Sequence, residues 1–142
     1  MQILLAREER MTPHIHIRTV NLDCSDAHEM ARFYGGLLGW EPTAVEPNWV
    51  LMRDPGGGTG LSFKKTDWYE RPIWPEEPGN QQKMIHLEVR VIPQDGQDPA
   101  AALAAATRLA LSVGGTLAEP QARDDLRVVL DPSGHPLCLF LD

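Results

Sequence analysis

An internal repeat is the feature that most restricts how this chain can fold. Three landmarks of the first half return in the second half at an offset of 76 or 77 residues, in a chain of 142 residues. They are an arginine within a predicted helix, a glycine at the end of that helix and an Asp-Pro turn: Arg32 and Arg108, Gly39 and Gly115, Asp54-Pro55 and Asp131-Pro132. Such landmarks also recur by chance, but the nearly constant offset favours a duplicated module.

The hydrophobic pattern gives both halves the same order of elements. In the first half we predict a strand, a helix and three short strands at 15–24, 27–38, 40–46, 49–54 and 59–65. In the second half the same order is predicted at 84–92, 99–113, 116–120, 125–130 and 136–141. The chain is therefore predicted to be an α+β protein built from two βαβββ modules.

Both predicted helices have recognisable ends and an apolar stripe. Asp26 and Asp98 are suited to cap the first turns, and Gly39 is suited to end the first helix. The stripe of the first helix contains Met30, Phe33, Tyr34, Leu37 and Leu38. The stripe predicted for the alanine-rich second helix contains Ala102, Ala106, Leu109 and Val113.

The segment between the two modules differs from both. Residues 66–80, TDWYERPIWPEEPGN, contain three prolines, which deny the segment a regular strand ladder, and three aromatic residues. We divide the chain into a leader at 1–14, loosely held or disordered, a first module at 15–65, a connector at 66–83 and a second module at 84–141. Met11 is an alternative start for the chain.

Charge and composition argue against several classes of partner. Thirteen basic residues against twenty acidic ones give a net charge of −7, whereas nucleic acids and anionic membranes select basic surfaces. No stretch approaches the roughly 20 apolar residues of a membrane span, and the opening segment MQILLAREERMTP lacks the features of a signal peptide. Two cysteines without a spaced pattern suit a reducing compartment, so we expect a cytoplasmic protein.

Three runs resemble the vicinal oxygen chelate superfamily, of the glyoxalase and bleomycin-resistance type. TVNLDCSDAHEMARFYGGLLGW resembles its first strand and helix, and DPSGHPLCLF resembles its closing turn and strand. LSFKKTDWYERPIWPEEPGNQQKMIHLEV is similar to a glyoxalase-like subgroup with a connector rich in proline and tryptophan. The resemblance covers about residues 15–141.

The resemblance implies a sheet from each module, the two forming a curved cradle with the helices outside. In that superfamily a metal ion, where present, lies on the concave face and holds two adjacent oxygens of the substrate. The modules pair within one chain or are exchanged in a dimer, so the resemblance also leads us to expect a homodimer.

The resemblance also supplies candidate metal ligands. Carried over residue by residue, the metal positions fall on Thr19, on Ser62 or its neighbour Leu61, on His86 and on Cys138. Only His86 has the usual residue type, because a histidine is common at the position of Thr19 and a glutamate at that of Cys138. We favour a cradle without a cofactor, in which His86 lines the cavity and Cys138 fills space. A divalent metal held by His86 and Cys138 is the alternative.

Strand parity places polar rows on the face away from the helices. The polar rows are Thr19, Asn21 and Asp23 on the first strand and His86, Glu88 and Arg90 on the fifth. On the last strand Pro136, Cys138 and Phe140 face the same side. Glu88 suits a general base and Arg90 an anchor for an anionic group, although the two also suit an ordinary ion pair. Trp68 and Trp74 suit a flat lid over a planar ligand, or the cover of a sheet edge or dimer seam.

These residues suggest two candidate functions. A structural or interaction role is a third possibility. The first is binding of a small planar or aromatic molecule in the cradle without a complete metal site, with Thr19, Asn21, Asp23, Trp68, Trp74, Arg90 and Phe140 as contacts. The second is a lyase or isomerase acting on a hydroxy- or keto-compound, with His86 and Glu88 as catalytic residues. The substituted metal positions argue against glyoxalase I and ring-cleaving dioxygenase activity.

Overall fold

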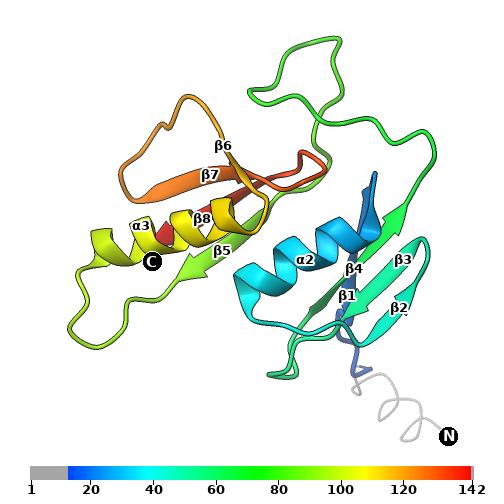
Figure 1. The fold of residues 1–142 in the computed structure, drawn as a ribbon, viewed down its shortest axis with the longest axis horizontal. Helices are drawn as coiled ribbons and strands as arrows, with labels where there is room; N and C mark the ends of the chain where they lie inside the picture. Colours follow the sequence, from blue (N-terminus) through cyan, green and yellow to red (C-terminus); the bar gives the residue numbers. More distant parts are fainter. Residues whose placement is uncertain (1–12, 142) are drawn as a thin grey trace, which may run out of the picture.

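The computed structural model describes residues 13–141, which form two sheets, each accompanied by a helix (Figure 1). The first module consists of β1 (Thr19–Cys24), α2 (Ala27–Leu38), β2 (Ala44–Glu46), β3 (Trp49–Met52) and β4 (Gly60–Lys65). The second consists of β5 (Leu87–Val91), α3 (Pro99–Ser112), β6 (Thr116–Leu117), β7 (Leu126–Leu130) and β8 (Pro136–Leu141). Most of the predicted leader, residues 1–12, lies outside the described residues.

The two sheets have the same topology. Their strand orders are β1-β4-β3-β2 and β5-β8-β7-β6. In each sheet the first pair is parallel and the other pairs are antiparallel. The repeat in the sequence is therefore a repeat of structure, and the predicted fold class of two βαβββ modules is confirmed.

Helix α2 forms as its sequence predicts. The Asp26 carboxylate accepts hydrogen bonds from the backbone N–H groups of His28 and Glu29, at 3.0 and 3.1 Å. Gly39 ends the helix at a φ of 71°, a left-handed conformation that glycine adopts without a steric penalty. The buried side of the helix includes Phe33 and Tyr34.

Helix α3 confirms the predicted cap but only part of the predicted stripe. Asp98 accepts a 3.2 Å hydrogen bond from the backbone N–H of Ala101. Leu109, which we placed in the buried stripe, is 42% exposed, whereas Leu103 and Ala110 are buried. An alanine-rich helix offers little contrast between its faces, so its pattern located the buried side poorly.

Strand β1 begins four residues later than predicted, at Thr19. Ile15 and Ile17 precede it and are 83% and 72% exposed. These isoleucines occupy odd positions, while the buried Leu22 and Cys24 occupy even ones. Because successive side chains of a strand point to opposite faces, one strand cannot bury both sets.

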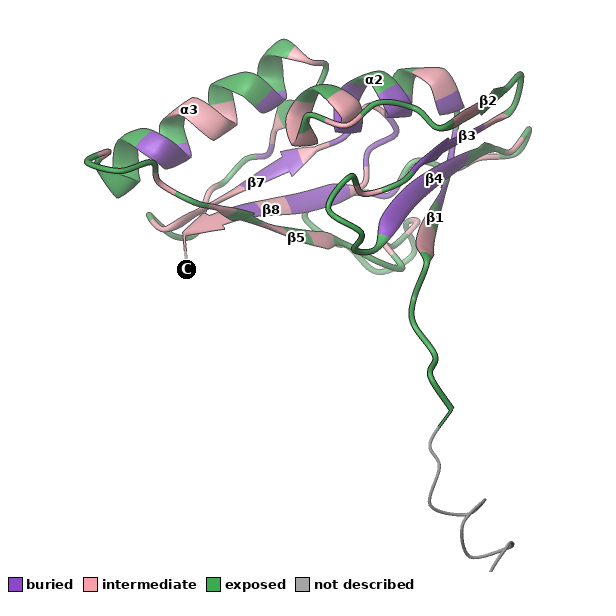
Figure 2. Cartoon of the chain, turned by 90° about the horizontal axis from the view of Figure 1, so that it is seen from below, coloured by how far each residue is buried: buried purple, intermediate pink, exposed green. Residues whose placement is uncertain are grey.

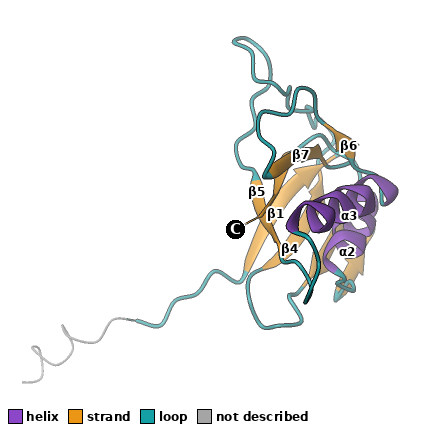
Figure 3. Cartoon of the chain, turned by 90° about the vertical axis from the view of Figure 1, so that its left-hand side faces the viewer, coloured by secondary structure: helices purple, strands orange, loops and turns teal. Residues whose placement is uncertain are grey.

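A single buried core joins the two modules. Both helices lie on one side of the sheets, as Figures 2 and 3 show. The core includes Met30, Phe33, Tyr34 and Phe63 from the first module and Leu103, Ala110, Val129 and Leu137 from the second. The helices approach so closely that a Cβ added to Gly36 would lie 2.6 Å from Val113 Cγ1. The two modules therefore pack against each other within one chain.

Among residues 13–141 no helix lies on the opposite side of the two sheets, and we call that side the open face. Asn21 and Asp23 of β1 and Glu88 and Arg90 of β5 are exposed there, as strand parity predicted. The connector runs between β4 and β5 without a helix or strand and extends to residue 86, because β5 starts three residues later than predicted. Within residues 13–141 no helix has the length and apolar character needed to cross a membrane.

Candidate functional site

A hollow beside the open face lies between β1 and the connector. We call it the connector cleft, and it has a volume of about 440 Å³. Its lining consists of Asn21, Leu22, Asp23, Thr66, Trp68, Tyr69, Glu70, Pro72, Gln81, Gln82, Lys83, Met84, Ile85 and His135. In Figure 1 the connector is the long green segment that links the two sheets.

Three large apolar side chains of the connector cleft are left in contact with solvent. Trp68 is 85% exposed, Met84 is 82% exposed and Ile85 is 41% exposed. Around them stand groups able to form hydrogen bonds, namely Asn21, Asp23, Gln81, Gln82 and Lys83. The cleft therefore combines a flat apolar surface with a polar border.

The connector is tied to the turn between β7 and β8. The Tyr69 hydroxyl donates a 2.6 Å hydrogen bond to the carbonyl oxygen of Ser133, and Arg71 Nη1 donates one of 3.0 Å to that of Pro132. The first module contacts the same turn, since the backbone N–H of Ser25 donates to Ser133 Oγ at 3.2 Å. The turn thus fixes the position of the connector cleft relative to both modules.

A buried carboxylate holds this turn together. Asp131 is 1% exposed and accepts hydrogen bonds from the Tyr34 hydroxyl at 2.8 Å and from the backbone N–H groups of Ser133 and His135. Its Oδ2 also lies 2.8 Å from His135 Nδ1. Burial raises the pKa of the Tyr69 phenol well above its usual range, and the nearby Asp131 charge adds to that shift.

Trp74 does not line the connector cleft. Lys83 Nζ lies 4.9 Å from the centre of the Trp74 ring and pairs with the carboxylate of Glu76. Trp74 therefore packs within the connector itself. Of the two tryptophans suggested as a lid, Trp68 lines the connector cleft and Trp74 does not.

A second hollow of about 340 Å³ lies on the open face of the second sheet, and we call it the sheet hollow. It is lined by Glu88, Arg123, Asp125, Leu126, Cys138, Phe140 and Leu141. Glu88 and Cys138 are neighbours across the parallel pair β5 and β8. Partial burial raises the pKa of the Cys138 thiol, and the Glu88 charge raises it further.

The structure thus divides the predicted site residues. Asn21, Asp23 and Trp68 line the connector cleft, and Glu88, Cys138 and Phe140 line the sheet hollow. Thr19, His86, Trp74 and Arg90 line neither hollow. His86 precedes β5, is exposed and has its Nε2 3.7 Å from Glu88 Oε1.

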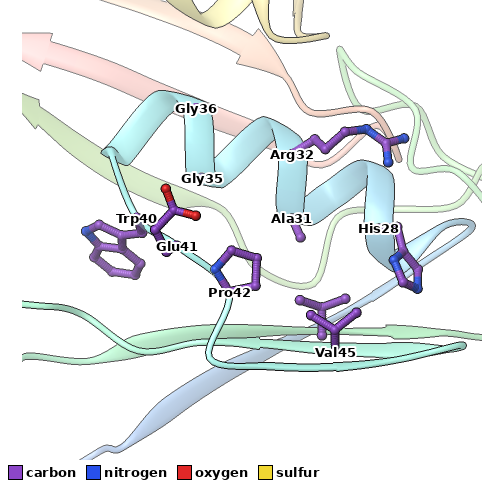
Figure 4. Close-up of a pocket in the computed structure, with 10 residues that line it drawn as sticks. His28, Ala31, Arg32, Gly35, Gly36, Trp40, Glu41, Pro42 and Val45 are labelled. Atoms are coloured by element: carbon purple, nitrogen blue, oxygen red, sulfur yellow. The ribbon is translucent and has the colours of Figure 1, made fainter.

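A third hollow, the outer groove, lies on the helix side of the first module. It has a volume of about 390 Å³ and is bounded by α2, the loop after it and strands β2 and β3. Figure 4 shows His28 and Arg32 projecting from α2 and Trp40 and Pro42 on the loop. His28 Nε2 lies 2.9 Å from the carbonyl oxygen of Glu46, so this ring already has a partner.

The comparison with protein families agrees with this architecture. The model of the glyoxalase-like domain family matches residues 19–140. This chain belongs to the glyoxalase-like domain family. The assignment confirms the resemblance to the vicinal oxygen chelate superfamily. No match was found among curated proteins.

Solved glyoxalase-like structures share the fold at low sequence identity. A glyoxalase-related enzyme from Fulvimarina pelagi is 19% identical, with a TM-score of 0.65 over 91% of this chain and 89% of that one. A glyoxalase/bleomycin resistance protein/dioxygenase family enzyme from Burkholderia phytofirmans is 18% identical, with a TM-score of 0.63 over 89% and 98%. A glyoxalase/bleomycin resistance protein/dioxygenase from Nocardioides is 17% identical, with a TM-score of 0.61 over 99% and 91%.

The metal ion that this superfamily implies does not fit the residues present. Ser62 is 4% exposed, and its Oγ accepts a 2.7 Å hydrogen bond from Asn21 Nδ2. Cys138 lies opposite Glu88 rather than His86 in the β5–β8 register. Within residues 13–141 no group of three or more His, Cys, Asp or Glu side chains is arranged to hold a metal ion.

Sequence reasoning missed several residues of the connector cleft. Tyr69, Gln81, Gln82 and Lys83 reach the connector cleft from an irregular segment, whose path no periodicity predicts. In the sequence, His135 stands out only as part of the predicted closing turn. The spacing of Asp131 and His135 within the run DPSGH was the one signal available for it.

Proposed function

We propose that this glyoxalase-like domain binds a small planar molecule in the connector cleft, without a metal ion. The observation that carries the proposal is the Trp68 indole, which is 85% exposed at the border of a cleft of about 440 Å³. A volume of this size lies within the usual range for small-molecule sites, roughly 300–1,000 Å³.

The lining also indicates the character of the ligand. An exposed indole offers a flat surface for stacking against an aromatic ring. Asn21, Gln81 and Gln82 supply amides, which both donate and accept hydrogen bonds, as the edge of a planar polar molecule requires. Charges of both signs, Asp23 and Lys83, line the same cleft, so a ligand without a large net charge fits best.

A lyase or isomerase on a hydroxy- or keto-compound is the second candidate. It is favoured by the position of His86 Nε2, 3.7 Å from Glu88 Oε1, and by the place of Glu88 in the sheet hollow. The side chains of His86 and Glu88 are 37% and 67% exposed, so water competes with any substrate for both. The connector cleft is therefore the stronger candidate site.

Equilibrium dialysis with 4-nitroanisole, a planar aromatic probe that cannot ionise, tests the proposal. We expect Trp68→Leu to weaken binding about five- to tenfold through loss of the stacking surface. The matched control is Trp40→Leu, since Trp40 lines the outer groove, and it should bind as the unmodified protein does. Absence of binding, or a loss caused by Trp40→Leu alone, would contradict the proposal.

The exposed Trp68, Met84 and Ile85 also suit a contact between two copies of the chain, as expected for a homodimer. Light scattering gives the molecular mass in solution of the unmodified protein and of Trp68→Leu, and so separates ligand binding by Trp68 from a contact between two copies. If Trp68 serves the ligand, the variant keeps the oligomeric state while losing affinity for the probe.

A further inference from the structure

The His135 ring lies between a buried carboxylate and the Tyr69 hydroxyl, and both His135 and Tyr69 line the connector cleft. Its side chain is 13% exposed and lines the cleft. Nδ1 lies 2.8 Å from Asp131 Oδ2. A carboxylate only accepts hydrogen bonds, so Nδ1 carries a proton in this contact and Nε2 of the neutral ring keeps its lone pair.

Tyr69 leaves that lone pair available. The Tyr69 oxygen lies 3.4 Å from His135 Nε2, but its single proton is donated to the carbonyl oxygen of Ser133 at 2.6 Å. The phenol oxygen is therefore placed beside Nε2 as an acceptor. Once Nε2 takes a proton, Asp131 and Tyr69 offer an acceptor to each N–H of the ring.

The ring is also held rigidly. The Asp131 carboxylate accepts hydrogen bonds from the Tyr34 hydroxyl and from two backbone N–H groups of its own turn. It therefore cannot rotate away without breaking several hydrogen bonds. A base fixed by a buried carboxylate is the arrangement in which histidine accepts protons in catalysis. A purely structural clamp between the modules explains Tyr34 and Asp131 but does not require that the ring it holds line the connector cleft.

We propose that the Asp131–His135 pair is a proton-accepting site that deprotonates an acidic hydroxyl, phenolic or enolic, of a planar molecule in the connector cleft. The ligand O–H bond breaks, its electron pair stays on the ligand oxygen, and the proton forms an N–H bond at His135 Nε2. The resulting anion faces an imidazolium that is held by Asp131. The other charged residues that line the cleft are Lys83, Asp23 and Glu70. This inference rests on the proposed binding function and adds the substrate class.

The pair 4-nitrophenol and 4-nitroanisole separates proton transfer from binding. Only the phenol ionises, and its anion has its own visible absorption band. At a pH where the free phenol is mainly neutral, we expect the full chain to enrich the anion of the bound phenol about tenfold or more over solution.

His135→Asn is the decisive variant, because the asparagine amide can still donate to Asp131 while the cleft-facing ring nitrogen is lost. It should abolish the enrichment of the anion, while 4-nitroanisole, which has no proton to give up, should still bind measurably in dialysis. Tyr69→Phe should reduce the enrichment by removing the acceptor for the new N–H. His28→Asn, which alters a histidine outside the cleft, is the matched control and should change neither readout.

The outcomes distinguish the two proposals. Enrichment lost only in the cleft variants, with 4-nitroanisole still bound, supports the proton-accepting site. Binding of both probes without enrichment, or enrichment that persists in His135→Asn, overturns the proton-accepting site and leaves the binding function standing. If neither probe binds, both proposals fail.

Discussion

The Tyr34 hydroxyl donates a 2.8 Å hydrogen bond to the Asp131 carboxylate, joining residues 97 positions apart. Tyr34 belongs to the helix of the first module and Asp131 to the last turn of the second. The phenol is fully buried and stacks on Phe63 at 5.4 Å between ring centres. One residue pair thus connects the shared core to the turn that positions the connector cleft.

Tyr34→Phe removes this hydrogen bond without removing the ring. We expect the free energy of unfolding to fall by about 1.5–3 kcal/mol, because a buried charged acceptor loses a donor. Urea denaturation measures the effect, and a double-mutant cycle with Asp131→Asn isolates the pair. A change in the free energy of unfolding below about 0.5 kcal/mol would mean that the contact is energetically unimportant.

Stability should decline at alkaline pH. Burial raises the pKa of Cys24 to about 12, and it also raises those of Tyr34 and Tyr69. From about pH 9 the unfolded chain releases protons that the folded chain retains, so the free energy of unfolding falls as pH rises, by about 1.4 kcal/mol per pH unit for each group. Urea midpoints across this range test it. Cys24→Ala should make the decline less steep, and a flat profile would refute the assignment.

Cys138 should react slowly with iodoacetamide despite its partial exposure. Its raised thiol pKa lowers the thiolate fraction at neutral pH, and the thiolate is the reactive form. In a Cys24→Ala background, Glu88→Gln should accelerate alkylation because it removes the neighbouring negative charge. Mass spectrometry gives the rate, and an unchanged rate would show that Glu88 does not control this thiol.

Metal analysis tests independently whether the residues at the superfamily's metal positions hold a metal ion in this chain. Protein purified without chelating resin should carry no stoichiometric zinc, manganese or iron, because Ser62 is hydrogen-bonded to Asn21 and Cys138 lies opposite Glu88. His86→Ala should then leave the metal content unchanged. A stoichiometric metal that disappears with His86→Ala would show that a chelate site forms after all.

The sequence predicted the modules well because periodicity and turn chemistry are local. The even positions of β1 and the cap at Asp26 are each determined by near neighbours. The errors have the same origin. Ile15 and Ile17 look strand-like, although their phase conflicts with that of β1, and Leu109 lies in a helix whose alanines hide its buried side.

The candidate site was harder to predict because it depends on the path of the connector. Parity placed Asn21 and Asp23 on the open face, but nothing local indicates that Tyr69 reaches the carbonyl of Ser133. His135 could not be identified from the sequence for a related reason. The other residues that line its cleft all lie at least 50 positions earlier in the chain.

Chemical-shift mapping of the amide groups during titration with 4-nitroanisole tests the central claim most directly, because the three hollows have separate linings. We predict that the largest shifts fall on Asp23, Trp68, Gln82 and His135 of the connector cleft. Largest shifts on Glu88, Cys138 and Phe140, or on Gly35 and Gly36 of the outer groove, would contradict the account.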